Sequence, residues 1–168
     1  LNWQVTLGAF TDITLHNTGN GVYGTLQTLA GSSPDDNEGD FLDYDNDGDL
    51  DLYVANFSGQ DRLYRNNFTG SGGFTHTNVT ATLMPVADLS ALDADCADLD
   101  EDGDPDVMVA NDVGAAEYYL INVLNVPDTR APRAVNLEQA PNRTAGAAAT
   151  IVRVQVYDNE SYYVTWYE

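Results

Sequence analysis

The sequence contains no lysine, and its only cationic side chains are six arginines against 27 aspartates and glutamates. The formal net charge of the 168 residues is therefore −21. A protein that reads nucleic acid through phosphate contacts needs a basic surface, so this charge excludes that class. Hydrophobic residues still make up 43% of the chain, which distinguishes it from a disordered acidic tail and predicts a packed core.

Cysteine and long apolar runs are equally scarce. The single Cys96 excludes an internal disulfide and a zinc site built from several cysteines, and we expect it to be a small buried residue. No apolar run approaches the ~18 to 20 residues of a membrane helix, so we expect no membrane span. The sequence starts at Leu1 without a basic stretch followed by an apolar one. We expect either that a signal peptide has been removed or that the chain is a piece of a longer protein.

An internal repeat organises the middle of the sequence. Residues 40–56 and 95–111 align at an offset of 55, and ten of these seventeen positions are identical. The same offset pairs three further positions downstream: Gly59 with Gly114, Tyr64 with Tyr119, and Asn67 with Asn122. A period of this length is typical of a propeller blade or a similar β unit.

Alternating apolar and polar residues predict strands throughout the chain. Leu50, Leu52 and Val54 share one face of a strand that follows the acidic segment of the first repeat, and Val107 and Val109 do so in the second. We expect further strands at residues 2–7, 10–15, 22–29, 62–66, 74–80 and 116–123, separated by Gly, Asn, Asp and Ser clusters. No stretch has clear helical periodicity, although residues 81–97 could hold a short turn.

The composition changes near residue 125, which predicts a division into residues 1–124 and residues 125–168. The first part holds the repeats, centred on residues 40–67 and 95–122. The second part begins with a Pro- and Arg-containing linker and continues as two alternating segments, residues 151–157 and 162–167, around an Asp158-Asn159 turn. We expect these segments to begin a β-sandwich domain.

Each repeat carries five aspartates at alternating positions around a glycine. This spacing is that of a calcium loop, in which positions 1, 3 and 5 supply side-chain oxygens, position 6 is a turn glycine and position 7 supplies a backbone carbonyl. Magnesium suits the loop less well because it demands octahedral geometry and keeps its waters. The sequence therefore predicts two Ca²⁺ sites, formed by Asp43, Asp45, Asp47, Asp49 and Asp51 and by Asp98, Asp100, Asp102, Asp104 and Asp106.

Two other interpretations of the acidic loops fit the sequence less well. An EF-hand needs a bidentate Glu at position 12 and flanking helices, but position 12 is Val54 in one copy and Val109 in the other. Asp51 and Asp106 at position 9 are expected to close the site instead. Solvated acidic turns that bind nothing are the remaining alternative, and the presence of two matched copies disfavours it. Asp40 and Asp95, three residues before the loops, are expected to be turn or supporting residues rather than ligands.

The pattern D-x-D-x-D-G-D-x-D, followed by an apolar strand, Val-Ala-Asn, Leu63-Tyr64-Arg65-Asn66 and a Gly-rich turn into Phe74-Thr75, resembles the FG-GAP/VCBS repeats of integrin-α-type β-propellers. The resemblance covers residues 40–122 well and residues 8–39 loosely. It implies an all-β fold of four-stranded blades with Ca²⁺ in a hairpin loop, in secreted or cell-surface proteins. The C-terminal piece is similar to the opening strands of Ig-like or fibronectin-type domains. Two repeats are fewer than the four to eight blades that close a propeller, so the propeller is expected to be incomplete in this chain.

These observations predict an extracellular, calcium-binding structural or adhesion module without catalytic activity. The two histidines, His16 and His76, lie near no pattern that suggests a nucleophile and its base. Other protein subunits, including copies of the same chain, or surface glycans are the expected partners. A lectin-like propeller fragment, or a non-catalytic part of a secreted polysaccharide-degrading enzyme, remain as alternatives.

Two further motifs concern glycosylation and assembly. Possible glycosylation sequons lie at Asn67, Asn78, Asn142 and Asn159, and that at Asn56 is better explained by a structural role at the end of a strand. The tail SYYVTWYE, residues 161–168, has high β-propensity and one charge. It is expected to be a sandwich strand or, alternatively, a strand that adds to a neighbouring subunit and so builds a filament.

Overall fold

Short antiparallel strands joined by polar turns form nearly all of the structure. The computed structural model describes residues 11–32, 35–68, 74–87, 90–112, 114–127, 133–139 and 152–157. Within these residues there are eleven strands and one short helix. They are β1 (Ile13–Asn17), β2 (Tyr23–Thr28), β3 (Asp36–Leu42), β4 (Asp51–Asn56), β5 (Arg62–Asn66), β6 (His76–Asn78), α1 (Thr80–Leu83), β7 (Ala91–Ala97), β8 (Asp106–Asn111), β9 (Tyr118–Leu120), β10 (Arg133–Gln139) and β11 (Val152–Tyr157).

The strands pair into four sheets, and every pairing is antiparallel. The first repeat forms a four-stranded sheet in the order β3-β4-β5-β6, and the second forms a three-stranded sheet in the order β7-β8-β9. Two-stranded sheets, β1-β2 and β10-β11, flank them in sequence. The prediction of an all-β fold is confirmed. The described part of the chain shows no closed barrel or propeller.

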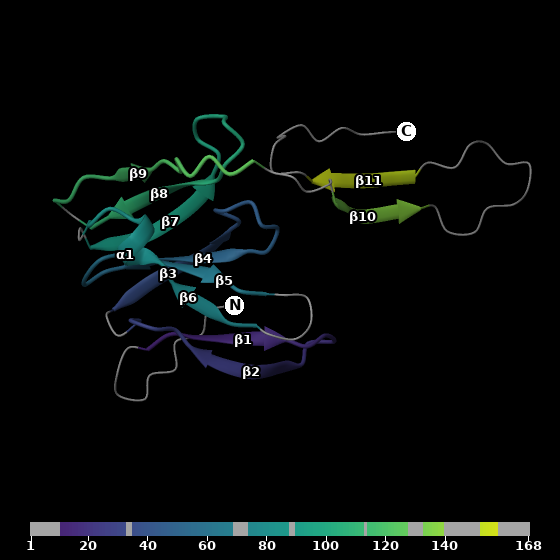
Figure 1. Ribbon diagram of the computed structural model, residues 1–168, viewed down its shortest axis with the longest axis horizontal. Coiled ribbons are helices and arrows are strands. Elements are labelled where there is room, and N and C mark those ends of the chain that lie inside the picture. The colour runs from purple at the N-terminus through teal and green to yellow at the C-terminus, as the bar shows by residue number, and fades with distance from the viewer. Residues whose placement is uncertain are drawn as a thin grey trace, which may run out of the picture.

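The two repeat sheets meet through their first strands, β3 and β7 (Figure 1). Two polar contacts join these strands. The Asn37 side chain donates to the Ala91 carbonyl at 2.9 Å, and the Cys96 backbone N–H donates to Asp40 Oδ2 at 3.0 Å. Asp40 therefore supports the packing of one repeat against the other, in keeping with its expected role outside the ligand set.

The strand pairing shows that the two copies align at an offset of 55 up to their second strands and at an offset of 56 in their third strands. The alignment expected from the sequence is therefore wrong by one residue in the third strands. Leu52 pairs with Tyr64 in the first sheet, whereas its counterpart Val107 pairs with Leu120 in the second. Tyr64 therefore corresponds to Leu120 rather than to Tyr119. The connection between β8 and β9 is one residue longer than that between β4 and β5. The alignment was wrong because a loop insertion changes the offset without disturbing the strand pattern on either side.

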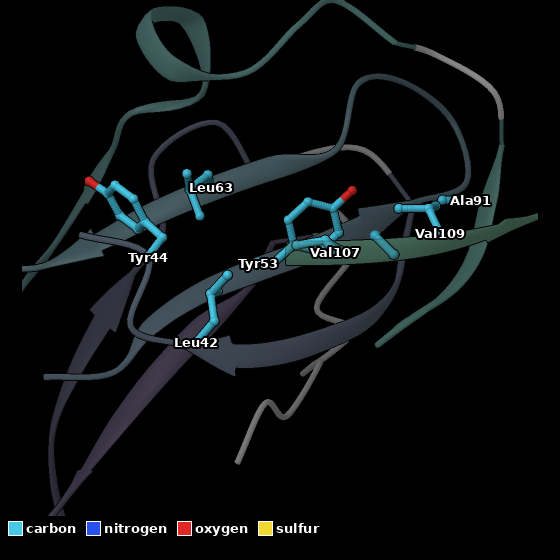
Figure 2. Packing of buried hydrophobic residues seen from close by; sticks show 8 residues of the cluster. Leu42, Tyr44, Tyr53, Leu63, Ala91, Val107 and Val109 are labelled. Carbon is cyan, nitrogen blue, oxygen red and sulfur yellow. The ribbon is translucent and has the colours of Figure 1, made fainter. Parts of the chain in front are cut away.

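The main hydrophobic core lies between the two repeats. Figure 2 shows Tyr53 of β4 beside Val107 and Val109 of β8, with Leu42 and Leu63 in the same cluster. A second cluster joins β4 and β5 to the turn after β2: Leu29, Leu52, Val54 and Tyr64. Because both faces of β4 are covered, all six of its residues are buried.

The β1-β2 hairpin is joined to the outer strand of the first repeat. The Gln27 side chain donates to the His76 carbonyl at 3.0 Å and accepts from the His76 N–H at 2.8 Å. The two histidines also pack on one ring, since His16 stacks on Phe74 and His76 meets its edge. Both histidine rings therefore take part in packing contacts.

The segment expected to be a linker contains a strand, which corrects its assignment as a connection. β10 lies within it and pairs with β11 (Figure 1). β11 confirms the expected strand at residues 151–157. Its expected partner, residues 162–167, lies outside the described residues, as does the strand expected at 2–7. The expected Ig-like domain is not shown, and the division at residue 125 stays a prediction.

Two strands of the repeats, β3 and β7, and the helix α1 are not among the expected strands. β3 and β7 were missed because their acidic residues obscure any apolar alternation. The only helix in the described residues, α1, lies close to the short turn expected after residue 80.

The described residues include no helix that is long and apolar enough to cross a membrane.

Candidate metal centre

The two acidic loops adopt the same hydrogen-bonded structure. In the first, the Asp43 carboxylate accepts the backbone N–H groups of Asp47 at 3.1 Å and Gly48 at 2.9 Å. In the second, Asp98 accepts those of Asp102 at 3.1 Å and Gly103 at 2.9 Å. The residue at position 5 then accepts the N–H of position 7 in both copies, at 3.1 Å and 3.0 Å. The loops therefore wrap around the aspartate at position 1.

Two positions in each loop have left-handed backbone conformations. Position 4 has φ 55° at Asn46 and 64° at Glu101, and position 6 has φ 85° at Gly48 and 97° at Gly103. Glycine adopts such angles without the steric penalty of a Cβ, and asparagine tolerates them better than most other residues. The turn expected from the glycine spacing is thus present in both loops.

The aspartate at position 9 connects each loop to the third strand of its sheet. Asp51 Oδ2 accepts the Tyr44 N–H at 3.2 Å, and its Oδ1 accepts the Asn66 N–H at 2.7 Å. Asp106 makes the matching bonds to Leu99 at 2.8 Å and to Asn122 at 2.7 Å. Both carboxylates are buried, with 0% and 1% of the residue exposed.

Sequence reasoning missed Asn66 and Asn122 as supporting residues. Both follow the core of a third strand, and each repeat contains an asparagine there, which was the available signal. The uncorrected offset of 55 pairs Asn67 with Asn122 and so conceals the match. The strand register and the matching bonds to Asp51 and Asp106 show that Asn66 and Asn122 occupy equivalent places.

Each loop brings three carboxylates close enough to share a metal ion. The groups are Asp43, Asp45 and Asp47 in the first loop and Asp98, Asp100 and Asp106 in the second, with ligand atoms within 4.8 Å of one another. Together the two groups use positions 1, 3, 5 and 9. The remaining expected ligands belong to neither group of three, and their coordination stays a prediction: Asp49, Asp51, Asp102 and Asp104.

Burial and mutual repulsion raise the pKa of several loop carboxyls. Burial, followed by the charges of Asp47 and Asp43, raises the pKa of Asp45. Burial and Asp47 raise the pKa of Asp49 to about 6, and burial raises that of Asp51 to about 8. The pKa of Asp100 in the second loop is also raised. A divalent cation would relieve this repulsion by favouring the ionised carboxylates.

The donor set fits a hard divalent cation. All ligand candidates are carboxylate or carbonyl oxygens, which suit Ca²⁺ and Mg²⁺ rather than soft metals. Asp45 Oδ1 is a buried oxygen for which the structure shows no hydrogen-bond partner, as expected of an atom reserved for an ion. The described residues thus form two sites able to hold a metal ion.

The expected glycosylation sites differ in what the structure shows of them. The Asn67 side chain donates to Thr77 Oγ1 at 2.9 Å, and the Asn78 side chain donates to the Ala30 carbonyl at 2.8 Å. Both amides therefore have contacts within the fold. Asn142 and Asn159 lie outside the described residues, and glycosylation of all four residues stays a prediction.

An open apolar groove of about 400 Å³ lies between the two repeats, near the end of β9. Side chains from both repeats and the residues after α1 line it, among them Leu42, Leu63, Met84, Leu120 and Leu124. Its lining is mainly apolar, and the residues with polar side-chain groups in it are Tyr44, Tyr53, Thr82, Tyr119 and Asn122. Its composition suits an apolar segment of polypeptide better than a hydrophilic ligand.

The comparisons with known proteins agree with the resemblance seen in the sequence. Neither the comparison with curated proteins nor that with solved structures gave a match. Residues 43–109 match the family model of the FG-GAP-like repeat. The matched segment runs from the first ligand candidate, Asp43, through the second acidic loop to β8. It covers under half of the chain, and within it the protein carries an FG-GAP-like repeat.

Proposed function

We propose that this protein is an extracellular, non-catalytic structural or adhesion module that Ca²⁺ stabilises at two loops. The observation that carries the proposal is the repeated loop network. Two segments fold the same backbone around the same aspartates and leave a buried carboxylate oxygen without a partner in one of them. The match to the FG-GAP-like repeat supports this function and an extracellular location, where Ca²⁺ is abundant.

The loop residues would hold the two ions. In the first loop Asp43, Asp45 and Asp47 would supply carboxylate oxygens, and in the second loop Asp98, Asp100 and Asp106 would do so. A bound Ca²⁺ supplies positive charge and a fixed set of oxygen contacts. The chain itself holds each loop between two strands, β3 and β4 or β7 and β8, so that an ordered loop fixes the ends of both strands.

The expected stabilisation is large for a small domain. At a free Ca²⁺ concentration ~100 times the dissociation constant, one independent site adds about 2.7 kcal/mol to the free energy of unfolding. Two such sites would supply a large share of the free energy of unfolding of a typical domain, which is ~5 to 15 kcal/mol. The apoprotein is therefore expected to be much less stable, which is consistent with a protein used where Ca²⁺ is always present.

A thermal melt in millimolar Ca²⁺, repeated in excess EDTA, tests this proposal. We expect a large loss of Tm in EDTA, and recovery when Ca²⁺ is restored. Mg²⁺ at the same concentration is the matched control and should restore less of the Tm, because its octahedral preference suits the loop poorly. Identical melting curves in Ca²⁺ and EDTA would contradict a structural role for the ion.

The open edge of the second repeat favours assembly by strand exchange as a more specific form of this function. The sheet of the first repeat has a fourth strand, β6, whose outer edge is covered at His76 by the Gln27 side chain. The second sheet ends at β9 in the described residues, beside the apolar groove. Unpaired strand edges accept further strands readily.

We propose residues 161–168 of a second copy as the strand that adds to β9. This tail is rich in aromatic and β-branched residues and carries one charge, which matches an apolar groove. Because the donor and acceptor surfaces differ, repeated exchange produces a filament rather than a closed dimer. Light scattering and electron microscopy in Ca²⁺ should show long polymers. Deleting the tail, or substituting Tyr119→Lys on the β9 edge, should abolish them, and a monodisperse monomer in the unmodified chain would refute this assembly.

A further inference from the structure

We infer that the two metal loops bind their ions cooperatively because Asn46 and Asn122 join them directly. The inference rests on the proposed calcium binding and goes beyond it, since two independent sites would serve the proposed function equally well. It concerns two side chains that are not among the ligand candidates. Each of the two residues belongs to one repeat and donates its side-chain amide to the loop of the other repeat.

The first connection runs from loop to loop. Asn46, at position 4 of the first loop, donates its side-chain amide to Asp104 Oδ1 in the second loop at 2.6 Å. The same nitrogen donates to the Val126 carbonyl at 2.8 Å. Asn46 is 6% exposed and Asp104 is 9% exposed, so water competes little with this contact. Breaking it would remove a hydrogen bond between two buried side chains.

The second connection runs from the end of β9 to the first loop. The Asn122 backbone N–H donates to Asp106 Oδ1 at 2.7 Å, within the second site. Its side-chain amide donates to the Tyr44 carbonyl at 2.8 Å, within the first. The N–H of Tyr44 in turn donates to Asp51. One residue therefore contacts a ligand candidate of its own site and the backbone that surrounds the other site.

The equivalent residue in the first repeat provides an internal comparison. Asn66 uses its backbone N–H on Asp51 just as Asn122 does on Asp106. Its side-chain amide, however, donates at 3.1 Å to the Leu50 carbonyl of its own repeat. The connection between loops is therefore a property of Asn122 in its tertiary position, and not of the asparagine that both repeats contain.

Coupling follows from these contacts. An ion in the first loop fixes the backbone at Tyr44 and Asn46, and so holds Asn122 and Asp104 in place before the second ion binds. The second ion then loses less conformational entropy on binding, and by linkage each ion favours the other equally. Repulsion between the two cations acts in the opposite direction. We infer that ordering prevails, because Asn46, Asp104 and Tyr44 are buried and the joining groups are at hydrogen-bonding distance.

Calorimetric titration of the full chain with Ca²⁺ tests this inference. In the unmodified protein we expect two ions to bind, with the second about 5- to 10-fold tighter after statistical correction, which is within the usual range of allosteric coupling. Disabling the first loop with Asp45→Asn should weaken binding at the second loop by a similar factor. Circular dichroism before titration confirms that each variant is folded.

Asn46→Gly removes the joining amide while tolerating the left-handed backbone at this position. We expect both ions still to bind, with the affinity ratio falling toward one. Glu101→Gly is the matched control, since Glu101 occupies the same loop position with φ 64° and its side chain is exposed. It should leave the ratio unchanged.

The outcomes separate this inference from the proposed function. Two ions with equal and independent affinities in the unmodified chain would overturn the coupling and leave calcium binding intact. If the double variant Asn46→Gly and Asn122→Ala keeps the ratio of the two Ca²⁺ affinities, these residues do not carry the coupling. The absence of any bound Ca²⁺ would overturn both the coupling and the proposed function.

Discussion

The two repeats contain nearly the same acidic loop but lie in different surroundings. In the first repeat, β4 is buried along its whole length, whereas the equivalent β8 alternates between buried and exposed residues after its first two. Position 3 of the loop is half-buried in the first copy, Asp45, and exposed in the second, Asp100. The local sequence therefore sets the conformation of the loop. The burial and the electrostatics of the loop depend on the structure that packs around it.

A second difference concerns the acid that precedes each third strand. Asp61 accepts the Asn56 N–H at 2.8 Å, just as Glu117 accepts the Asn111 N–H at 2.6 Å. Asp61 also accepts the hydroxyl groups of Tyr53 at 2.6 Å and of Tyr118 from β9. The acid of the first repeat therefore joins the two sheets, a role that the structure does not give to Glu117.

The largest expected effect comes from equivalent residues in the two central strands. Tyr53 is 1% exposed and its counterpart Met108 is 45% exposed. Tyr53→Ala should lower the free energy of unfolding by about 3–5 kcal/mol, since it removes a buried aromatic ring from the core between the repeats. Met108→Ala should lower it by less than about 1 kcal/mol. Urea unfolding in Ca²⁺ measures both losses, and similar losses would contradict the difference in burial.

The two strand-preceding acids should differ by a smaller amount. Asp61→Ala leaves two tyrosine hydroxyls and a backbone N–H without their acceptor, which should cost about 2–4 kcal/mol. Glu117→Ala removes one bond at an exposed side chain and should cost roughly 0.5–1 kcal/mol. Urea unfolding again provides the measurement. Equal costs would show that the contact between Asp61 and Tyr118 contributes no stability.

Substituting a loop aspartate should lower the stability of the protein in Ca²⁺ and raise it in EDTA. In Ca²⁺, Asp45→Asn should cost about 2–3 kcal/mol by weakening one site. In EDTA the same substitution should stabilise the protein, because burial and neighbouring charges already disfavour the Asp45 carboxylate. Asp100→Asn is the matched variant in the more exposed loop and should gain less in EDTA. Thermal melts of both variants in the two buffers test this, and a loss of stability in EDTA would contradict the repulsion.

A further expected effect is a pH dependence that distinguishes the first strands of the repeats. Burial, followed by the neighbouring Asp12, raises the pKa of Asp36 to about 8, whereas Ala91 occupies the equivalent place in the second repeat. The folded state therefore holds a proton that the unfolded state loses near pH 4, and stability should fall as the pH rises from about 4 to 8.

Asp36→Ala, which makes the first repeat resemble the second at this position, tests that pH dependence. In EDTA, the variant should gain stability relative to the unmodified chain as the pH rises through this interval, and the difference should level off above pH 8. A difference that does not change with pH would mean that Asp36 ionises in the folded state as it does in the unfolded chain.

Much of the local structure could be predicted from the sequence. The aspartate spacing and glycine position of each loop predicted the turns, and the alternation in residues 50–55 predicted β4. The acidic strands β3 and β7 could not be predicted, because their partners rather than their own side chains make them strands. β10 was missed for a similar reason, since a segment with prolines and arginines gives no strand signal until it pairs with β11.

The sequence by itself determined that the chain is an all-β protein with two matched acidic loops, because spacing and periodicity are local properties. Only the tertiary structure decided that Asn66 and not Asn67 corresponds to Asn122, since a one-residue insertion alters the offset while backbone pairing preserves the register. Tertiary packing also decided that Asn46 reaches Asp104, 58 positions away along the chain. Such contacts depend on how β3 packs against β7, and no short-range pattern records the packing of two sheets.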